Sequence, residues 1–155
     1  MQSDAGSGPV RVGVRRLPEG EGLALPAYMS AGAAGADVPA ALPADVTLKP
    51  GARRLVPAGF SLAIPPGYEA QVRPRSGLAL RSGITVLNAP GTIDSDYRGP
   101  IGVILVNLGS ESVTIHRGDR IAQLVIAPVS QARFDAEDEH EPTPRAAAGF
   151  GSTGS

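Results

Sequence analysis

Glycine and proline interrupt this sequence at short intervals along almost its whole length. The 155 residues include 20 Gly and 15 Pro, and the apolar runs between them are short. Strands are typically about five or six residues long, whereas helices need about ten or more, so this spacing favours strands. No alternation of strands and long helices is visible. We therefore predict an all-β fold, an antiparallel sandwich or a jelly-roll-like β-barrel.

Alternating apolar and polar residues indicate where the strands lie. Such alternation occurs within residues 10–17 and 67–73. Apolar residues between turn residues predict further short strands within 45–64 and 112–129, and the last stretch is broken at Arg117-Gly118-Asp119. With only six aromatic residues in the chain, the core that these strands bury has to be mainly aliphatic.

Residues 88–99, NAPGTIDSDYRG, lie between two apolar runs that begin at Ile84 and Ile101. A strand, a turn-rich segment and a second strand form the pattern of a β-hairpin, and we predict one here. The turn-rich segment carries two carboxylates, Asp94 and Asp96, beside a phenol and a guanidinium. A turn does not require these reactive groups, so they indicate a candidate functional site. Short polar side chains also stabilise turns, so a purely structural interpretation stays open.

Three other polar positions are candidate functional sites. Asp37 lies near the start of a predicted strand. The sequence Arg75-Ser76-Gly77 follows a strand, where backbone N–H groups can point at an anion. Gln123 interrupts an apolar strand, where a buried amide needs a hydrogen-bond partner. A turn acid and a capped helix of one or two turns are the structural alternatives for the first two.

Composition excludes several classes of function. The formal net charge is -1, so the chain has no basic field for a nucleic-acid backbone. It has no Cys and only two His, which argues against a zinc site, a thiolate nucleophile and a Ser-His-Asp triad. No membrane span or signal peptide is visible, so we expect a cytoplasmic protein.

The ends of the chain differ in composition from the middle. Residues 1–9 are small and polar and predict a disordered N-terminus. Residues 10–134 predict a single β-barrel domain. Residues 135–141, DAEDEHE, hold five acids in seven residues and predict a solvated tether. Residues 145–155 carry a lone aromatic among glycines, so we expect 135–155 to act as a tether and an arm that becomes ordered on a ligand.

The chain resembles the trimeric dUTPases, with five motifs in the family's order between Val10 and Gly154. The motifs are AGADV (34–38), PRSGLA (74–79), NAPGTIDSDYRG (88–99), GDRIAQLV (118–125) and RAAAGFGSTG (145–154). The resemblance implies a distorted jelly-roll-like β-barrel with a flexible C-terminal arm, assembled as a homotrimer with sites shared between subunits. It also implies hydrolysis of dUTP to dUMP and diphosphate, which keeps uracil out of DNA and supplies dUMP for thymidylate synthesis.

The resemblance assigns the residues of the central segment. Asp94 matches the acid that holds and activates the attacking water, which then attacks the α-phosphorus. Tyr97 matches the tyrosine that packs on the deoxyribose and excludes a 2′-hydroxyl. The wall that reads uracil, largely through backbone groups, is matched by Asn88, Gly91, Thr92, Ile93 and Gly102.

The resemblance also assigns the phosphate end of the substrate. Arg75, Ser76 and Gly77 match the phosphate-binding segment, and Gln123 matches a glutamine that touches phosphate. Asp37 matches an acid that reaches Mg²⁺ through water and faces neighbouring arginines; Mg²⁺ suits a triphosphate because it binds oxygens and keeps several waters.

The predicted arm would cover the bound nucleotide. Phe150 would stack over uracil, and closure would exclude water. The residues that would close on the β- and γ-phosphates are Arg145, Gly151, Ser152 and Thr153.

The sequence departs from the family pattern in the arm and beside the hairpin. Ala146 and Ala148 replace expected glycines, which predicts a stiffer arm unless both residues have negative φ. Pro100 replaces an acid or amide and removes one strand donor, so we expect a shifted pairing there. A regulatory relative that binds dUTP but turns it over slowly is one alternative. The related dCTP deaminase branch of the same fold and a structural module without a ligand are the others.

Overall fold

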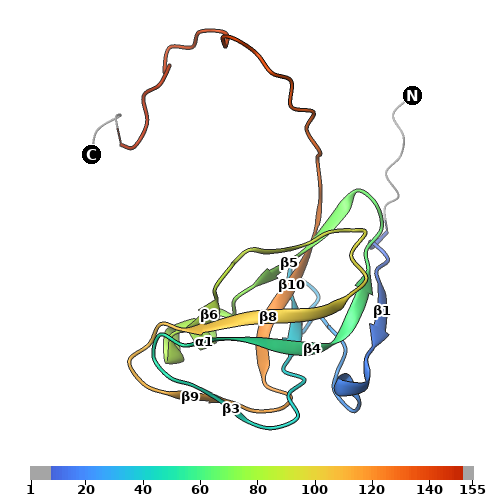
Figure 1. The fold of residues 1–155 in the computed structure, drawn as a ribbon. Helices are drawn as coiled ribbons and strands as arrows, with labels where there is room; N and C mark the ends of the chain where they lie inside the picture. The colour runs from blue at the N-terminus through green and yellow to red at the C-terminus, as the bar shows by residue number, and fades with distance from the viewer. Residues whose placement is uncertain (1–7, 152–155) are drawn as a thin grey trace.

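The computed structural model describes residues 8–151, and strands make up most of its regular structure (Figure 1). One four-stranded sheet has the order β1-β4-β8-β6. Its strands are β1 (Gly13–Arg16), β4 (Arg53–Ala63), β8 (Pro100–Asn107) and β6 (Ile84–Val86). All neighbouring strands in it are antiparallel.

A second four-stranded sheet has the order β2-β10-β5-β7, and it is also antiparallel. Its strands are β2 (Ala36–Pro39), β10 (Arg120–Pro128), β5 (Tyr68–Arg73) and β7 (Gly91–Ile93). A two-stranded sheet pairs β3 (Val46–Leu48) with β9 (Val113–Ile115). The predicted all-β, jelly-roll-like class is confirmed.

Helical structure within residues 8–151 is limited to a short 3₁₀ turn, Pro18–Gly20, and α1, Ser76–Ser82. The seven residues of α1 match the one or two helical turns that the sequence allows after Arg75. The helix ends at Gly83, whose φ of 67° is the left-handed conformation that glycine adopts without steric cost. Neither helical segment of the described chain is long and apolar enough to cross a membrane.

Both four-stranded sheets contribute buried side chains to one aliphatic core. Alternate residues of each strand point inward, as the two-residue period of a strand requires. In β4 and β8 the inward residues include Val56, Ala58, Phe60, Val103 and Leu105, and in β5 and β10 they include Ala70, Val72, Ala122 and Leu124. Phe60 is the only aromatic residue among the buried members, as the composition predicts.

The predicted hairpin around residues 88–99 is only partly right. β6 and β8 pair antiparallel, with Ile84 opposite Asn107, as the two strands of a hairpin would. The segment between them is not a solvated tip, because Gly91–Ile93 forms β7 and pairs with β5 in the other sheet. Gly91 and Ile93 are buried there, and a three-residue strand is too short to show alternation in the sequence.

The pairing of β4 with β8 is irregular beside this segment, as the presence of Pro100 predicts. Pro57 lies opposite Gly102 and Ser61 lies opposite Pro100, so extra residues of β4 bulge between these pairs. Gly59 has a φ of 82° within the bulge, and a Cβ there would come within 2.6 Å of the Cα of Gly20. The bulge therefore depends on glycine as well as on the missing proline N–H.

The chain leaves the sandwich after β10 and extends away from it in a long arc (Figure 1). The Val129 N–H donates to the Gly67 carbonyl at 2.9 Å. From Ser130 to Gly151 almost every residue is exposed, and the described chain forms no helix or strand there. The predicted limits of barrel, tether and arm remain predictions, and the expected disorder of residues 1–9 falls mostly outside the described residues.

Asn107 is a fully buried polar residue whose side chain hydrogen-bonds to backbone groups at one end of the sandwich. Its side-chain amide donates to the carbonyls of Leu48 at 2.9 Å and Glu111 at 2.7 Å, and its Oδ1 accepts from the Gly109 N–H at 2.9 Å. One side chain thereby satisfies backbone groups from the end of β3 and from the turn that follows β8.

We predict that Asn107→Leu lowers the free energy of unfolding by about 3 kcal/mol or more, since each buried backbone group left without a partner costs about 1–3 kcal/mol. Urea unfolding followed by circular dichroism would measure it. Ser110→Ala, in the exposed part of the same turn, is the control and should change stability by less than about 0.5 kcal/mol. A comparable loss in both variants would contradict this account of Asn107.

Candidate active site

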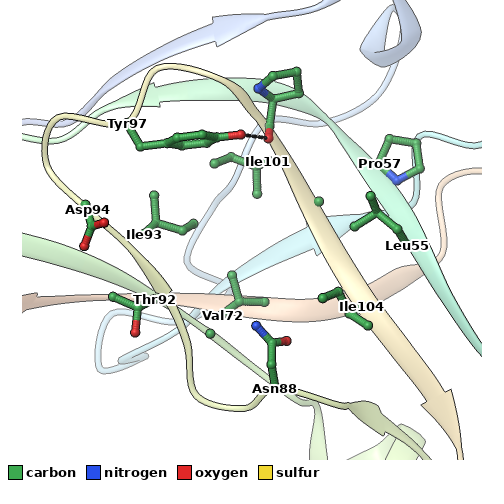
Figure 2. Close-up of a pocket in the computed structure, with 13 residues that line it drawn as sticks. Leu55, Pro57, Val72, Asn88, Thr92, Ile93, Asp94, Tyr97, Ile101 and Ile104 are labelled. Atoms are coloured by element: carbon green, nitrogen blue, oxygen red, sulfur yellow. Dashed lines mark hydrogen bonds between the residues drawn. The ribbon is translucent and has the colours of Figure 1, made fainter.

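A pocket of about 430 Å³ opens where the segment between β6 and β8 crosses from one sheet to the other (Figure 2). Strands of both sheets contribute to its walls. The lining residues are Leu55, Pro57, Val72, Asn88, Gly91, Thr92, Ile93, Asp94, Tyr97, Pro100, Ile101, Gly102 and Ile104. A mainly apolar wall with a few polar groups at its rim is typical of a small-molecule site.

The strand register determines which residues reach this pocket. Ile101 and Val103 of β8 point into the core, so Gly102 and Ile104 point outward and line the pocket. From β7, Gly91 and Ile93 are buried, whereas the side chain of Thr92 is exposed. Thr92 therefore contributes mainly its backbone to the pocket.

Tyr97 forms one wall of the pocket, and its position depends on Gly99. Its hydroxyl donates to the carbonyl of Pro100 at 2.9 Å, which turns the ring back over the chain (Figure 2). A Cβ on Gly99 would come within 2.4 Å of the Tyr97 hydroxyl oxygen. Only glycine at position 99 leaves room for the ring.

Asp94 lies at the rim, directly after β7 (Figure 2). Its backbone carbonyl accepts from the Tyr97 N–H at 3.2 Å, so a tight turn holds the two side chains at the same pocket. Within residues 8–151, its carboxylate has neither an ion pair nor a hydrogen bond to a side chain. An exposed carboxylate without a protein partner is available to bind and polarise water.

Gly102 accommodates Leu55 of the neighbouring strand. A Cβ at position 102 would come within 2.6 Å of a Leu55 methyl carbon. The Leu55 side chain is 63% exposed and lies over the Gly102 backbone at the pocket wall. A ligand that bonded to this backbone would find those hydrogen bonds partly shielded from water.

A second polar cluster lies on β2, β10 and the segment that follows β5. The carboxylate of Asp37, with a side chain 17% exposed, pairs with Arg75 at 3.4 Å and with Arg120 at 3.1 Å. Arg75 also donates to the carbonyl of Arg120 at 2.9 Å. These contacts fix two guanidinium groups beside one carboxylate, an arrangement able to bind an anion.

Gln123 belongs to the same cluster. Its amide donates to the carbonyl of Pro74 at 3.0 Å, which is the partner that a half-buried amide requires. A Cβ on Gly35 would come within 2.2 Å of the Gln123 Oε1. Gly35 therefore allows Gln123 to reach the start of the Arg75–Gly77 segment.

The structure brings the predicted residues together in two groups. Asn88, Gly91, Thr92, Ile93, Asp94, Tyr97 and Gly102 meet at the pocket, whereas Asp37, Arg75 and Gln123 meet at the second cluster with Ser76 and Gly77 next to it in α1. The second cluster does not line the pocket. In the arm, Arg145, Phe150 and Gly151 lie on the exposed tail, while Ser152 and Thr153 lie outside the described residues.

The donors available to a metal are few. Among residues 8–151, no three His, Cys, Asp or Glu side chains come together as a metal site. The Asp37 carboxylate already faces two guanidinium groups. This donor set fits a Mg²⁺ ion that keeps its waters and is held mainly by a ligand's phosphates, and it does not fit a cation ligated only by protein.

Several residues of the site were not predicted as functional from the sequence. Arg120 belongs to the GDRIAQLV motif, and its closeness in sequence to Gln123 could have indicated that it lies at the site. Gly35 and Gly99 also belong to motifs, but only the structure shows the side chains that pack against them. Leu55 gives no signal, because an apolar residue in a strand is normally a core residue.

The fold is an antiparallel jelly-roll-like sandwich, and it carries an apolar pocket and a cluster of two arginines. These features define the class of protein: a β-barrel that binds a small molecule with an anionic group. Residues 22–154 match the dUTPase family. The chain belongs to the dUTPase family.

Two relatives show how closely the chain follows the family. It is 61% identical over 150 residues to the deoxyuridine 5'-triphosphate nucleotidohydrolase of Methylocella silvestris, covering 96% of this chain and 94% of that protein. It is 65% identical over 136 residues to the enzyme of the same name from Desulfotalea psychrophila, covering 88% and 91%.

Solved structures share the fold. A mutant dUTPase of Staphylococcus bacteriophage 80alpha with dUpNHpp superposes with a TM-score of 0.83 at 24% identity, covering 94% of this chain and 99% of that one. A mutant dUTPase from phage phi11 of S. aureus, described with a structural Mg(II) ion, has a TM-score of 0.76 at 23% identity and covers 85% and 99%. These identities are low, so the similarity supports the fold alone.

We predict that Gly35→Ala displaces the Gln123 side chain, because its new methyl group would overlap the Gln123 amide. Loss of the bond to Pro74 should lower the free energy of unfolding by about 1 kcal/mol and shift the Gln123 side-chain amide signals in a ¹⁵N–¹H NMR spectrum.

Gly32→Ala is the matched control for Gly35→Ala, because a Cβ at Gly32 meets no atom within 4 Å. Unchanged Gln123 signals in the Gly35→Ala protein would show that the glycine is not needed for this contact.

Proposed function

We propose that the chain hydrolyses dUTP to dUMP and diphosphate, by attack of an Asp94-bound water on the α-phosphorus. The observation that carries this proposal is the pocket itself, where the free carboxylate of Asp94 lies beside Tyr97 and Asn88. The carboxylate would orient the water and accept its proton, and the bond from the α-phosphorus to the bridging oxygen would break as diphosphate leaves.

The pocket wall would select uracil. Backbone groups of β7 and Gly102, together with the amide of Asn88, can present hydrogen bonds to one edge of a pyrimidine. A cytosine would place a donor where uracil has an acceptor, and a buried mismatch costs about 1–3 kcal/mol. A close-packed wall around Ile93 would leave no space for a 5-methyl group.

Tyr97 would select deoxyribose over ribose. The bond from its hydroxyl to Pro100 keeps the ring at the pocket wall, and Gly99 lets it lie close to the chain. A ring restrained at both ends cannot move aside for a 2′-hydroxyl. This rigidity supports exclusion of ribonucleotides by shape.

The second cluster would bind the phosphates. Arg75 offers a guanidinium oriented by Asp37, and Ser76 and Gly77 begin α1, which has no side-chain cap on its first N–H groups. Gln123 would add an amide from β10. Mg²⁺ would be held by substrate phosphates and reach Asp37 through water; when bound, it supplies charge neutralisation to the leaving diphosphate.

A homotrimer would unite the two groups of residues. In one chain the Asp37 cluster does not line the Asp94 pocket. A pocket from one subunit placed against the cluster of its neighbour would give a complete site for a nucleoside triphosphate. The arm after residue 135 would then close over it, with Phe150 on the base and Arg145, Gly151, Ser152 and Thr153 at the phosphates. A cytoplasmic location remains a prediction.

We predict that Asp94→Asn lowers kcat about 10²–10⁴-fold, because an amide cannot accept the proton of water, while dUTP binding persists. Product analysis of dUMP and diphosphate, with calorimetric binding of dUTP, would measure both. EDTA should also suppress hydrolysis if Mg²⁺ is required. Asp96→Asn is the control, since Asp96 lies two residues away and does not line the pocket; equal activity in the Asp94→Asn and native proteins would refute the assignment.

One observation favours a second candidate function, a regulatory relative that binds dUTP but hydrolyses it slowly. Ala146 has a φ of 45°, a left-handed conformation that costs alanine about 1 kcal/mol or more. Ala148 is not among the described residues with positive φ, so the concern about a stiff arm falls away there but stays at Ala146. Closure that needs this left-handed conformation at position 146 would carry the same cost, so an arm with alanine there would close less readily.

We predict that Ala146→Gly lowers KM for dUTP about fivefold, because glycine removes about 1 kcal/mol of backbone strain from the closed arm. Ala148→Gly is the matched control and should leave KM unchanged or raise it, because its glycine adds only flexibility. Steady-state kinetics of both variants would measure the difference. If neither substitution changes KM and native turnover is rapid, the regulatory alternative loses its support.

A further inference from the structure

The chain separates its charge between the sandwich and the tail. Residues 8–128 carry twelve Lys or Arg and nine Asp or Glu, a formal charge of +3, whereas residues 129–151 carry two Arg and five acidic residues, a formal charge of -3. All five acids of the tail fall within residues 135–141, here called the acidic tether. Charges segregated in this way attract one another when the two parts approach.

A groove of about 310 Å³ on the sandwich carries two arginines. It lies over β1 and the end of β4, with Gly13 and Ala63 in its walls and Arg15 and Arg98 at its sides. Both arginines are exposed, and in the described part of the chain neither pairs with a carboxylate. Arg98 instead donates to backbone carbonyls of Ser95 and Tyr97.

The groove adjoins the pocket that we assign to the base and sugar. Ser61, in the groove, lies opposite Pro100, which lines the pocket. Arg98 follows the pocket residue Tyr97 directly. A chain bound in the groove would therefore continue toward the pocket mouth, and the nine residue steps from Glu141 to Phe150 span up to about 30 Å when extended.

The tail, residues 129–151, makes almost no contact with the sandwich of its own chain in this structure. Apart from the Val129 bond to Gly67, every hydrogen bond of residues 129–151 in the described chain stays within the tail, as between Arg133 and Asp135 or His140 and Glu137. Figure 1 shows the tail arching away from the sandwich. The tail makes no hydrogen bond to its own groove in the described chain, which leaves the groove open to the tether of a second copy.

We propose that the acidic tether of one copy docks in the Arg15–Arg98 groove of another, and that this contact delivers the arm to the pocket beside it. The inference deepens the proposed function, because it needs copies assembled as proposed. The contact is electrostatic and solvent-exposed, so its strength falls with ionic strength; the Debye length shrinks from about 10 Å at 0.1 M to about 3 Å at 1 M salt.

Disulfide trapping tests this docking without relying on catalysis. The chain has no Cys, so a full-length Ala63→Cys/Ala136→Cys protein holds one thiol in the groove wall and one in the tether. Under a mild oxidant such as diamide, we expect covalent dimers and trimers at least tenfold faster than in the Ser110→Cys/Ala136→Cys control, which places the first thiol on an exposed turn far from the groove. The single Ala136→Cys protein corrects for tether-to-tether bonds.

The charge requirement is tested in the same background. Glu137→Gln, Asp138→Asn and Glu139→Gln together, or Arg15→Gln, should each slow the cross-link several-fold, as should 1 M NaCl. Lys49→Gln, on an exposed turn outside the groove, is the matched charge control for Arg15→Gln and should have no effect.

Three results would overturn the docking. These are cross-linking no faster than in the Ser110→Cys control, a loop closed within one chain that migrates as a monomer, and a rate insensitive to tether charge and salt. Light scattering and dUTP hydrolysis on the same samples separate the two proposals. If the protein is a trimer and hydrolyses dUTP but fails to form the cross-link under oxidant, the docking alone is refuted. If it is an inactive monomer, the proposed function is refuted as well.

Discussion

The pairing of β7 with β5 is the contact on which the pocket depends. It is only three residues long, with Val72 opposite Gly91 and Ala70 opposite Ile93. A Cβ at Gly91 would lie 3.2 Å from the Cβ of Val72, so a small residue there lets the strands approach. The pairing draws the chain after β6 out of its own sheet and into the other. Asn88 and Asp94 are carried to the same opening because they flank this short strand.

The order β10-β5-β7 also explains why the polar residues fall into two groups. β5 lies between the strand that carries Gln123 and the strand that precedes Asp94. Sheet geometry therefore keeps the arginine cluster away from the pocket within one chain. A nucleoside triphosphate has an apolar end and a highly charged end, and in the proposed homotrimer a contact between subunits would place both groups on one substrate.

Most strands were predictable, since they lie where the sequence alternates, and the five motifs indicated both groups of site residues. What could not be predicted depends on contacts between distant segments. β7 is too short to show periodicity. The Asp37–Arg75 pair joins residues far apart in the sequence. The need for Gly35 and Gly99 becomes visible only when the side chains of Gln123 and Tyr97 are placed against them.

Two aspartates illustrate how surroundings assign different roles to the same side chain. Asp37 is 17% exposed and faces two guanidinium groups, so its charge is committed to orienting Arg75 and Arg120. Asp94 is exposed at the pocket rim and has no such partner within residues 8–151. A carboxylate that is already bonded to two arginines has few acceptor positions left for water, whereas a carboxylate without a protein partner can bind water at both oxygens. The two arginines beside Asp37 therefore hold its carboxylate in place, whereas the carboxylate of Asp94 has no arginine beside it in the described chain and stays open to water.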